Sequence, residues 1–206
     1  MRPLNSFLDA CRSAVRSVMR VIAKSLNSLS GGHLSPNAIT ITSLLAHIPI
    51  AYLIAIYHPV WAAILLVIFG LFDALDGELA RLQNKASNAG MLLDASTDRF
   101  KEVILYVGIA YRLSYVAAAW AVAALGASLC VSYVKAKGET AVADNSLSAN
   151  QINRLFQDGL LRYEVRMFLL VVGLLTNHLV GAIVLIGILA SFTAIERLIK
   201  ISRKLS

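Results

Sequence analysis

The sequence is short of charged residues and of cysteines, and both shortages limit what the protein can be. Of its 206 residues, 15% are charged and 58% are hydrophobic, with a mean hydropathy of +0.70. A soluble domain of this size needs a more polar surface, so the composition indicates a membrane protein. The two cysteines, Cys11 in a basic segment and Cys130 in an apolar run, exclude a disulfide scaffold.

The N-terminal segment lacks the uninterrupted apolar core of a signal peptide, because charged residues recur throughout residues 1–24. Its apolar residues recur at intervals of three and four, and its basic residues form an i, i+4 stripe on another helical face: Arg12, Arg16, Arg20 and Lys24. We therefore expect residues 1–30 to form a juxtamembrane amphipathic helix in the headgroup layer, with its cations toward anionic lipid. A solvated helix or a frayed tail is the alternative.

The remaining residues, 31–206, contain six apolar stretches, each close to the ~20 residues that a spanning helix needs. They lie at about residues 38–57, 60–82, 90–111, 115–135, 161–176 and 178–198. Connections between the first four are short, which makes consecutive helices antiparallel neighbours. Residues 137–160 read as a long polar loop with at most one short surface helix. The expected fold is an all-α integral membrane domain of six transmembrane helices.

The basic residues are distributed unequally between the two sides of such a domain. With helices alternating in direction, 18 of the 19 Lys and Arg fall on or near one side, and Arg112 lies opposite. The positive-inside rule makes the basic side cytoplasmic and places both termini there. Membrane topology thus explains the net charge of +7, and we expect no nucleic-acid partner.

Acidic residues interrupt the apolar pattern in residues 72–100, FDALDGELARLQNKASNAGMLLDASTDRF. At ~100° per residue, Asp73 and Asp76 share one helical face, and Asp94 and Asp98 share a face of the next helix. Four carboxylates can therefore converge on one point. Such a cluster near hydrocarbon demands cations, and the basic residues close to it in the sequence are too few and lie at its edge. The pattern therefore predicts bound metal ions.

The ligand types of this cluster favour hard divalent ions. Carboxylate oxygens suit Mg²⁺ or Mn²⁺, and four aspartates can hold two ions with phosphate oxygens and water. No His or Cys stands in the cluster, which argues against zinc. Gly77 and Ala80 leave a slot for a ligand beside the metals, and Gly90 does the same on the opposing wall. Salt bridges at a helix end would explain one or two aspartates, but not four with small residues between them.

These residues fit the pattern D-x-x-D-G-x-x-A-R-x8-G-x-x-x-D-x-x-x-D, on which the chain resembles the CDP-alcohol phosphotransferases. The matching positions are Asp73, Asp76, Gly77, Ala80, Arg81, Gly90, Asp94 and Asp98. The resemblance implies an enzyme that transfers a phosphatidyl-type group from a CDP-linked lipid, CDP-diacylglycerol or CDP-archaeol, to an alcohol and releases CMP. It also suggests a homodimer. The 18 basic residues on one side, and the synthesis of the nucleotide in the cytoplasm, place the expected site on the cytoplasmic side of the cell membrane.

The resemblance also implies roles for individual residues. In the family, four aspartates hold two divalent ions on the diphosphate, and the last aspartate takes the proton from the incoming hydroxyl. Carried over, Asp73, Asp76 and Asp94 are the principal ligands of two Mg²⁺ ions, with Mn²⁺ as an alternative metal. Asp98 is then a ligand or near-ligand and the catalytic base.

The nucleotide is expected to contact the acidic motif and the start of the first span. The residues that the resemblance implies are Pro36, Asn37, Ala38, Ile39, Thr40, Gly77, Ala80, Arg81 and Ser87. The first helical turn favours anions through its free backbone amides. Pro36 and Asn37 can alternatively serve only to start the helix.

Basic residues at the cytoplasmic ends of the last three spans are candidate acceptor ligands: Lys135, Lys137, Arg162, Arg166 and Arg197. Each can alternatively be a headgroup anchor. The stretches SYVKAKGE and TAIERL resemble SY-x-x-AR-AE and T-V-V-Q-R of the inositol-phosphate branch, with departures at Lys137 and Glu196. We expect a phosphorylated polyol, inositol phosphate before glycerol 3-phosphate, because arginine forks bind phosphate oxygens bidentately.

Two other classes of protein would also place acids near membrane helices. A divalent-cation transporter is expected to have its site near the bilayer midplane, often with repeat symmetry. Here the acids lie toward the cytoplasmic ends of their spans, and the sequence has no evident repeat. A structural protein that binds lipid headgroups would not need Gly77 and Ala80 beside the acids. Release of CMP from a CDP-linked lipid distinguishes the enzyme from both.

Overall fold

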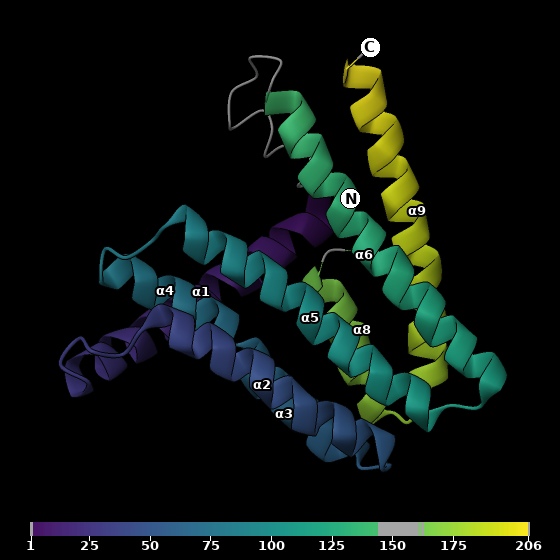
Figure 1. Cartoon of the computed structure of the whole chain (residues 1–206), viewed down its shortest axis with the longest axis horizontal. Coiled ribbons are helices and arrows are strands. Elements are labelled where there is room, and N and C mark those ends of the chain that lie inside the picture. The colour runs from purple at the N-terminus through teal and green to yellow at the C-terminus, as the bar shows by residue number, and fades with distance from the viewer. Residues whose placement is uncertain (1, 144–160, 162, 206) are drawn as a thin grey trace. The chain divides into compact units, whose positions relative to one another are not determined.

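The computed structural model describes residues 2–143, 161 and 163–205, and every regular element in this part of the chain is an α-helix (Figure 1). The helices are α1 (Arg2–Leu29), α2 (Pro36–Ala55), α3 (Pro59–Gly70), α4 (Phe72–Leu82), α5 (Asn88–Arg112), α6 (Tyr115–Ala143), α8 (Tyr163–Leu175) and α9 (Leu179–Leu205). The expected all-α fold class is confirmed.

Four helical segments are long and apolar enough to cross a membrane: Pro36–Ala55, Pro59–Leu82, Tyr115–Ala141 and Leu179–Arg203. By length and composition, the chain is therefore a multi-pass membrane protein. Within the described residues, α5 and α8 fall outside this group. α5 carries five charged side chains between residues 94 and 102, and α8 is only 13 residues long. Six crossings and the interfacial position of α1 stay predictions.

The expected second span is divided into α3 and α4 at Leu71. The N–H of Leu71 lies 3.3 Å from the carbonyl oxygen of Val67 and 3.2 Å from that of Ile68, so it is shared between a four-residue and a three-residue turn. Such sharing marks the end of a regular helical turn. α4 therefore begins just before Asp73, where the acidic motif starts.

The predicted loop over residues 137–160 is wrong for its first part, because α6 continues to Ala143. The hydrophobic stretch ends near residue 135, but the helix does not. Lys135 and Glu139 form an i, i+4 ion pair at 3.7 Å on its polar extension. Residues 144–160 lie outside the described part of the chain.

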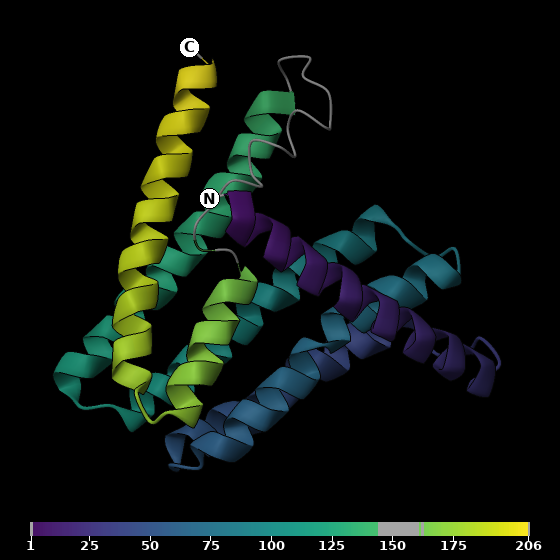
Figure 2. The same cartoon turned by 180° about the vertical axis from the view of Figure 1, so that it is seen from behind.

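The helices form two compact units, of which the first comprises Met1–Tyr52 and Ile64–Leu105. In this unit α1 lies across α4 (Figure 2). Met19 and Ala23 of α1 pack with Leu75 and Leu79 of α4 in a cluster of buried apolar side chains. Arg20 adds an ion pair, with its Nε 3.2 Å from Oε2 of Glu78. α1 is thereby fixed beside the helix that carries the acidic motif.

The second unit comprises Leu53–Ala63 and Tyr106–Ser206, and in it α9 packs along both α6 and α8 (Figures 1 and 2). A glycine lies at each contact. A Cβ added to Gly187 of α9 would be 3.5 Å from the Cα of Ala124 in α6. A Cβ added to Gly173 of α8 would be 2.6 Å from the Cβ of Ala182 in α9. The absence of side chains allows these helices to approach closely.

Three connections of the second unit meet around Arg112. Its guanidinium lies over the ring of Tyr57, 4.8 Å from the ring centroid, and its Nη2 donates a hydrogen bond of 3.1 Å to Oδ1 of Asn177. The hydroxyl of Tyr57 donates to the carbonyl oxygen of Arg112 at 2.8 Å. The connections α2–α3, α5–α6 and α8–α9 are therefore held together at one end of the unit.

Candidate active site

Three carboxylates of the first unit converge from two helices. Asp73 and Asp76 lie three residues apart on α4, and Asp94 lies on α5. Each offers an oxygen, and these three oxygens all lie within 4.8 Å of one another. That spacing is short enough for one cation to contact all three.

The surroundings of these carboxylates fit a hard divalent ion. Oδ1 of Asp94 is buried and has no hydrogen-bond partner among the described residues. A buried carboxylate oxygen is costly without a compensating contact, which a metal ion would supply. Thr40 of α2 donates a hydrogen bond to Oδ2 of Asp76, and its hydroxyl also lies 3.3 Å from the carbonyl oxygen of Pro36. Thr40 thus orients one member of the group.

Asp98, expected as a ligand or near-ligand, is not among these three carboxylates. Its Oδ1 lies 3.4 Å from Nζ of Lys101, and its Oδ2 lies 3.6 Å from Nη2 of Arg99. Asp98 follows Asp94 by one helical turn on α5, so it remains next to the group while cations hold it.

Lys101 also belongs to this site, although it was not among the predicted site residues. Its side chain is fully buried, and its ammonium forms an ion pair with Asp73 as well as with Asp98. The expectation that the nearby basic residues were too few and at the edge was wrong in this respect. A signal was present, because Lys101 lies three residues after Asp98 and seven after Asp94, on the same helical face.

The predicted nucleotide residues at the starts of α2 and α5 lie near one another. The hydroxyl of Ser87 accepts a hydrogen bond of 3.1 Å from the N–H of Gly90 and so caps α5. A Cβ at Gly90 would lie 3.4 Å from Oγ of Ser87 and 3.9 Å from Oδ1 of Asn37. Asn37 and Ala38 are exposed, whereas Ile39 packs in the apolar cluster with Met19.

The remaining nucleotide residues lie on α4, where a buried glutamate holds Arg81. Nη2 of Arg81 donates a hydrogen bond of 2.7 Å to Oε1 of Glu78, and Glu78 also pairs with Arg20. The Arg81 group lies over Gly77, 3.7 Å from the position that a Cβ would take. Ala80 is half-buried in the same turn. Glu78 is 5% exposed and was not among the predicted site residues.

The candidate acceptor residues belong to the second unit, and their environments differ. Arg166 and Arg197 are buried, 1% and 5% exposed, and close enough to interact electrostatically. Nη1 of Arg166 lies 3.3 Å from the carbonyl oxygen of Leu161, and Nη1 of Arg197 lies 3.3 Å from that of Val131. Lys135 and Lys137 are exposed. Arg162 lies outside the described residues.

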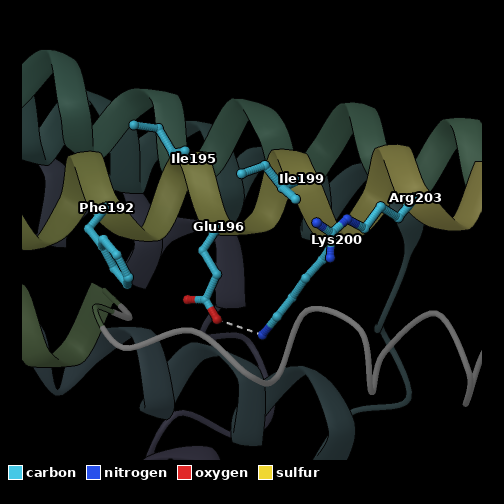
Figure 3. Close-up of a pocket in the computed structure, with 6 residues that line it drawn as sticks. All are labelled: Phe192, Ile195, Glu196, Ile199, Lys200 and Arg203. Atoms are coloured by element: carbon cyan, nitrogen blue, oxygen red, sulfur yellow. Dashed lines mark ion pairs between the residues drawn. The ribbon is translucent and has the colours of Figure 1, made fainter.

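A surface pocket runs along α9, and its lining includes none of the predicted site residues (Figure 3). Its lining residues are Phe192, Ile195, Glu196, Ile199, Lys200 and Arg203. Glu196 and Lys200 form an ion pair of 2.6 Å there. Because none of these residues was predicted to bind substrate or metal, the pocket adds nothing to the candidate site.

Comparisons with known proteins place the acidic motif inside a family match. The model of a family described as CDP-alcohol phosphatidyltransferase matches residues 33–195. The chain is 36% identical over 135 residues to the phosphatidylinositol phosphate synthase of Corynebacterium glutamicum, a match that covers 62% of this chain and 60% of that protein. It is 28% identical over 200 residues to the archaetidylinositol phosphate synthase of Pyrococcus horikoshii, covering 96% of this chain and 98% of that protein.

Solved structures share the fold. The Mycobacterium tuberculosis phosphatidylinositol phosphate synthase with CDP-DAG bound has a TM-score of 0.75 at 22% identity, over 90% of this chain and 94% of that chain. The same enzyme in complex with manganese and citrate also gives a TM-score of 0.75 at 22% identity, over 89% and 88%.

Proposed function

The chain belongs to the CDP-alcohol phosphatidyltransferase family, and we propose that it transfers a phosphatidyl-type group from a CDP-linked lipid to a phosphorylated polyol. CMP is the second product. The donor is CDP-diacylglycerol or CDP-archaeol, and the acceptor is inositol phosphate. The observation that carries the proposal is the convergence of Asp73, Asp76 and Asp94 within 4.8 Å, inside the matched region. Inositol phosphate as the acceptor is supported by the names of two relatives, a phosphatidylinositol phosphate synthase and an archaetidylinositol phosphate synthase.

The metal of this site is Mg²⁺ or Mn²⁺, held by Asp73, Asp76 and Asp94. Two ions are proposed, with Asp98 at the edge of the second, and a related enzyme has been crystallised with manganese. When bound, such ions neutralise charge on the diphosphate and stabilise the leaving nucleotide. Thr40 keeps the Asp76 carboxylate oriented for this task.

The chemistry is a substitution at the phosphorus that carries the lipid. The acceptor hydroxyl forms a new P–O bond, the P–O bond of the diphosphate breaks, and its electron pair leaves with CMP. Asp98 takes the proton of the hydroxyl, a role for which a carboxylate beside the reacting group suffices. Gly77, Arg81 and the first turn of α2 bind the CMP part, the turn through its free amides.

The acceptor phosphate is bound by Arg166 and Arg197. Two buried guanidinium groups close to each other repel, and a dianion between them relieves that repulsion. Each charge-assisted hydrogen bond to phosphate contributes about 1.5–3 kcal/mol. Arg162, Lys135 and Lys137 supply further positive charge at the mouth of the acceptor site.

The architecture that accompanies this function has six crossings in residues 31–206, with α5 and α8 as the third and fifth. α1 lies in the headgroup layer, and both termini and the active site face the cytoplasm of the cell membrane. The protein is a homodimer. The apolar spans, the basic residues of one side and the family membership support these proposals.

The test is release of CMP by the purified protein from CDP-diacylglycerol with Mg²⁺ and a panel of acceptors. We expect turnover with inositol phosphate, little with unphosphorylated inositol, and none in excess EDTA. Preference for glycerol 3-phosphate would show that it, and not inositol phosphate, is the acceptor, while the type of reaction would stay as proposed. Metal binding without CMP release from any acceptor would contradict the enzyme and favour a cation transporter.

The acceptor site is tested separately by Arg197→Ala, with Lys200→Ala on the same helix as a matched control. Arg197→Ala should raise the acceptor KM by about tenfold or more, the effect of losing one charge-assisted bond, and leave the KM for the CDP-lipid nearly unchanged. Lys200 pairs with Glu196 at the surface pocket, so its loss should change neither constant. An unchanged acceptor KM in both Arg166→Ala and Arg197→Ala would contradict the binding role and leave these residues with a structural role.

A further inference from the structure

The aspartate site contains a buried lysine for which the proposed reaction has no role. Lys101 is fully buried, and its ammonium group pairs with Asp73 and lies 3.4 Å from Oδ1 of Asp98. These two aspartates come from different helices, α4 and α5. Lys101 therefore joins the two walls of the site through one positive charge.

Because Lys101 is buried, its ammonium group needs these contacts with carboxylates to offset the loss of hydration. Removing an ammonium group from water costs several kcal/mol unless nearby anions compensate it. The same is true of the carboxylates, which are crowded together at the site. Lys101 and the two aspartates thus stabilise one another when no divalent ion is present.

The position of Lys101 also affects which carboxylates are available to a metal. Asp98 is held by Lys101 and Arg99, and it is not one of the three carboxylates that converge. Asp73 is one of the three, and it is also paired with Lys101. A cation bound by Asp73, Asp76 and Asp94 would therefore share Asp73 with the lysine and be repelled by its charge.

We propose that Lys101 is a resident cation of the aspartate site, which holds Asp73 and Asp98 together in the metal-free protein and weakens the binding of divalent ions. This inference rests on the proposed metal site. By linkage, the lysine stabilises the metal-free protein more than the metal-bound protein. Its role is positioning and charge balance, and no bond to substrate is required of it.

The experiment measures Mn²⁺ binding and thermal unfolding of the purified full-length protein, with Lys101→Met and Lys101→Gln as variants. Free Mn²⁺ is quantified by electron paramagnetic resonance. Both variants should bind Mn²⁺ at least about tenfold more tightly than the wild type, within the usual range of coupling between sites. They should also have a lower Tm without metal and a larger rise in Tm on addition of Mn²⁺. The control Lys200→Met removes a lysine that pairs with Glu196 on α9 and should match the wild type.

The outcomes separate this inference from the proposed function. If the wild type binds Mn²⁺ and both variants bind it equally or more weakly, Lys101 does not oppose the metal, and the inference fails while the metal site stands. If the wild type binds no Mn²⁺, both fail. A variant that folds only with Mn²⁺ supports the inference, because the ion then replaces the lysine. Failure of both variants to fold even with Mn²⁺ would overturn it.

Discussion

At the residue scale, Asp94 and Asp98 differ in the partners of their carboxylates, although they are only one helical turn apart on α5. Asp94 belongs to the three converging carboxylates, and its Oδ1 has no hydrogen-bond partner among the described residues. Both oxygens of Asp98 lie within 4 Å of a cation, Lys101 or Arg99. Under the proposed function, a metal ion would supply the contact that Asp94 lacks, whereas Asp98, already compensated by cations, would take the proton.

The first prediction contrasts Asp98→Asn with Asp94→Asn. An amide cannot accept the hydroxyl proton, so Asp98→Asn should lower kcat by about 100-fold or more and change Mn²⁺ affinity little. Asp94→Asn removes a charged ligand and should weaken Mn²⁺ binding itself. Turnover and Mn²⁺ titration of both variants check this. Near wild-type turnover of Asp98→Asn would show that another group is the base.

The sequence predicted the aspartates but missed their neighbours, for a physical reason. Helical spacing brings Asp73 and Asp76 onto one face of α4, and it brings Asp94 and Asp98 onto one face of α5. Of this second pair, Asp94 joins the converging group and Asp98 does not. Glu78 and Lys101 each have a partner one helical turn away, Arg81 and Asp98 respectively. They were missed because their other contacts, with Arg20 and Asp73, depend on how the helices pack. Lys101 meets Asp73 across α4 and α5, from 28 residues away.

At the element scale, four of the six apolar stretches predicted as spans lie in helices long and apolar enough to cross a membrane, but the helix ends were not predicted. α6 extends past residue 135 to Ala143, and the Lys135–Glu139 ion pair lies on this part of the helix, beyond the apolar stretch. The α3–α4 break at Leu71 was also missed, although Gly70 stands directly before it. Hydropathy indicates where an apolar stretch begins and ends, whereas backbone hydrogen bonds determine where the helix begins and ends.

The second prediction concerns the contact of α8 with α9. Gly173→Ala should lower the Tm, because the new Cβ would lie 2.6 Å from the Cβ of Ala182, and overpacking typically costs about 1–3 kcal/mol. The matched control is Gly181→Ala on α9, where no atom lies within 4 Å of the added Cβ. The control should be neutral or stabilising, since alanine is favoured over glycine in helices by about 1 kcal/mol. Equal thermal shifts in the two variants would contradict the close contact.

At the scale of the whole molecule, Arg112 is the exception to the predicted one-sided distribution of basic residues, and its side chain has other partners. The residue serves its own unit, because its guanidinium stacks on Tyr57 and binds Asn177. A cation–π contact contributes about 0.5–1 kcal/mol at an exposed site. The α2–α3, α5–α6 and α8–α9 connections thus lie at one end of the second unit.

The last prediction tests that topology with single cysteines, in protein whose Cys11 and Cys130 are replaced by Ala. An impermeant maleimide applied to intact cells should label His58→Cys and Tyr115→Cys but not Lys85→Cys. Tyr115 is 98% exposed at the start of α6. Permeabilised cells should label Lys85→Cys as well.

If α5 crosses the membrane, residues 85 and 115 lie on opposite sides. In a four-crossing chain they would lie on the same side, so an unlabelled Tyr115→Cys beside a labelled His58→Cys would exclude six crossings. Labelling of Lys85→Cys in intact cells would instead reverse the orientation and place the aspartates outside.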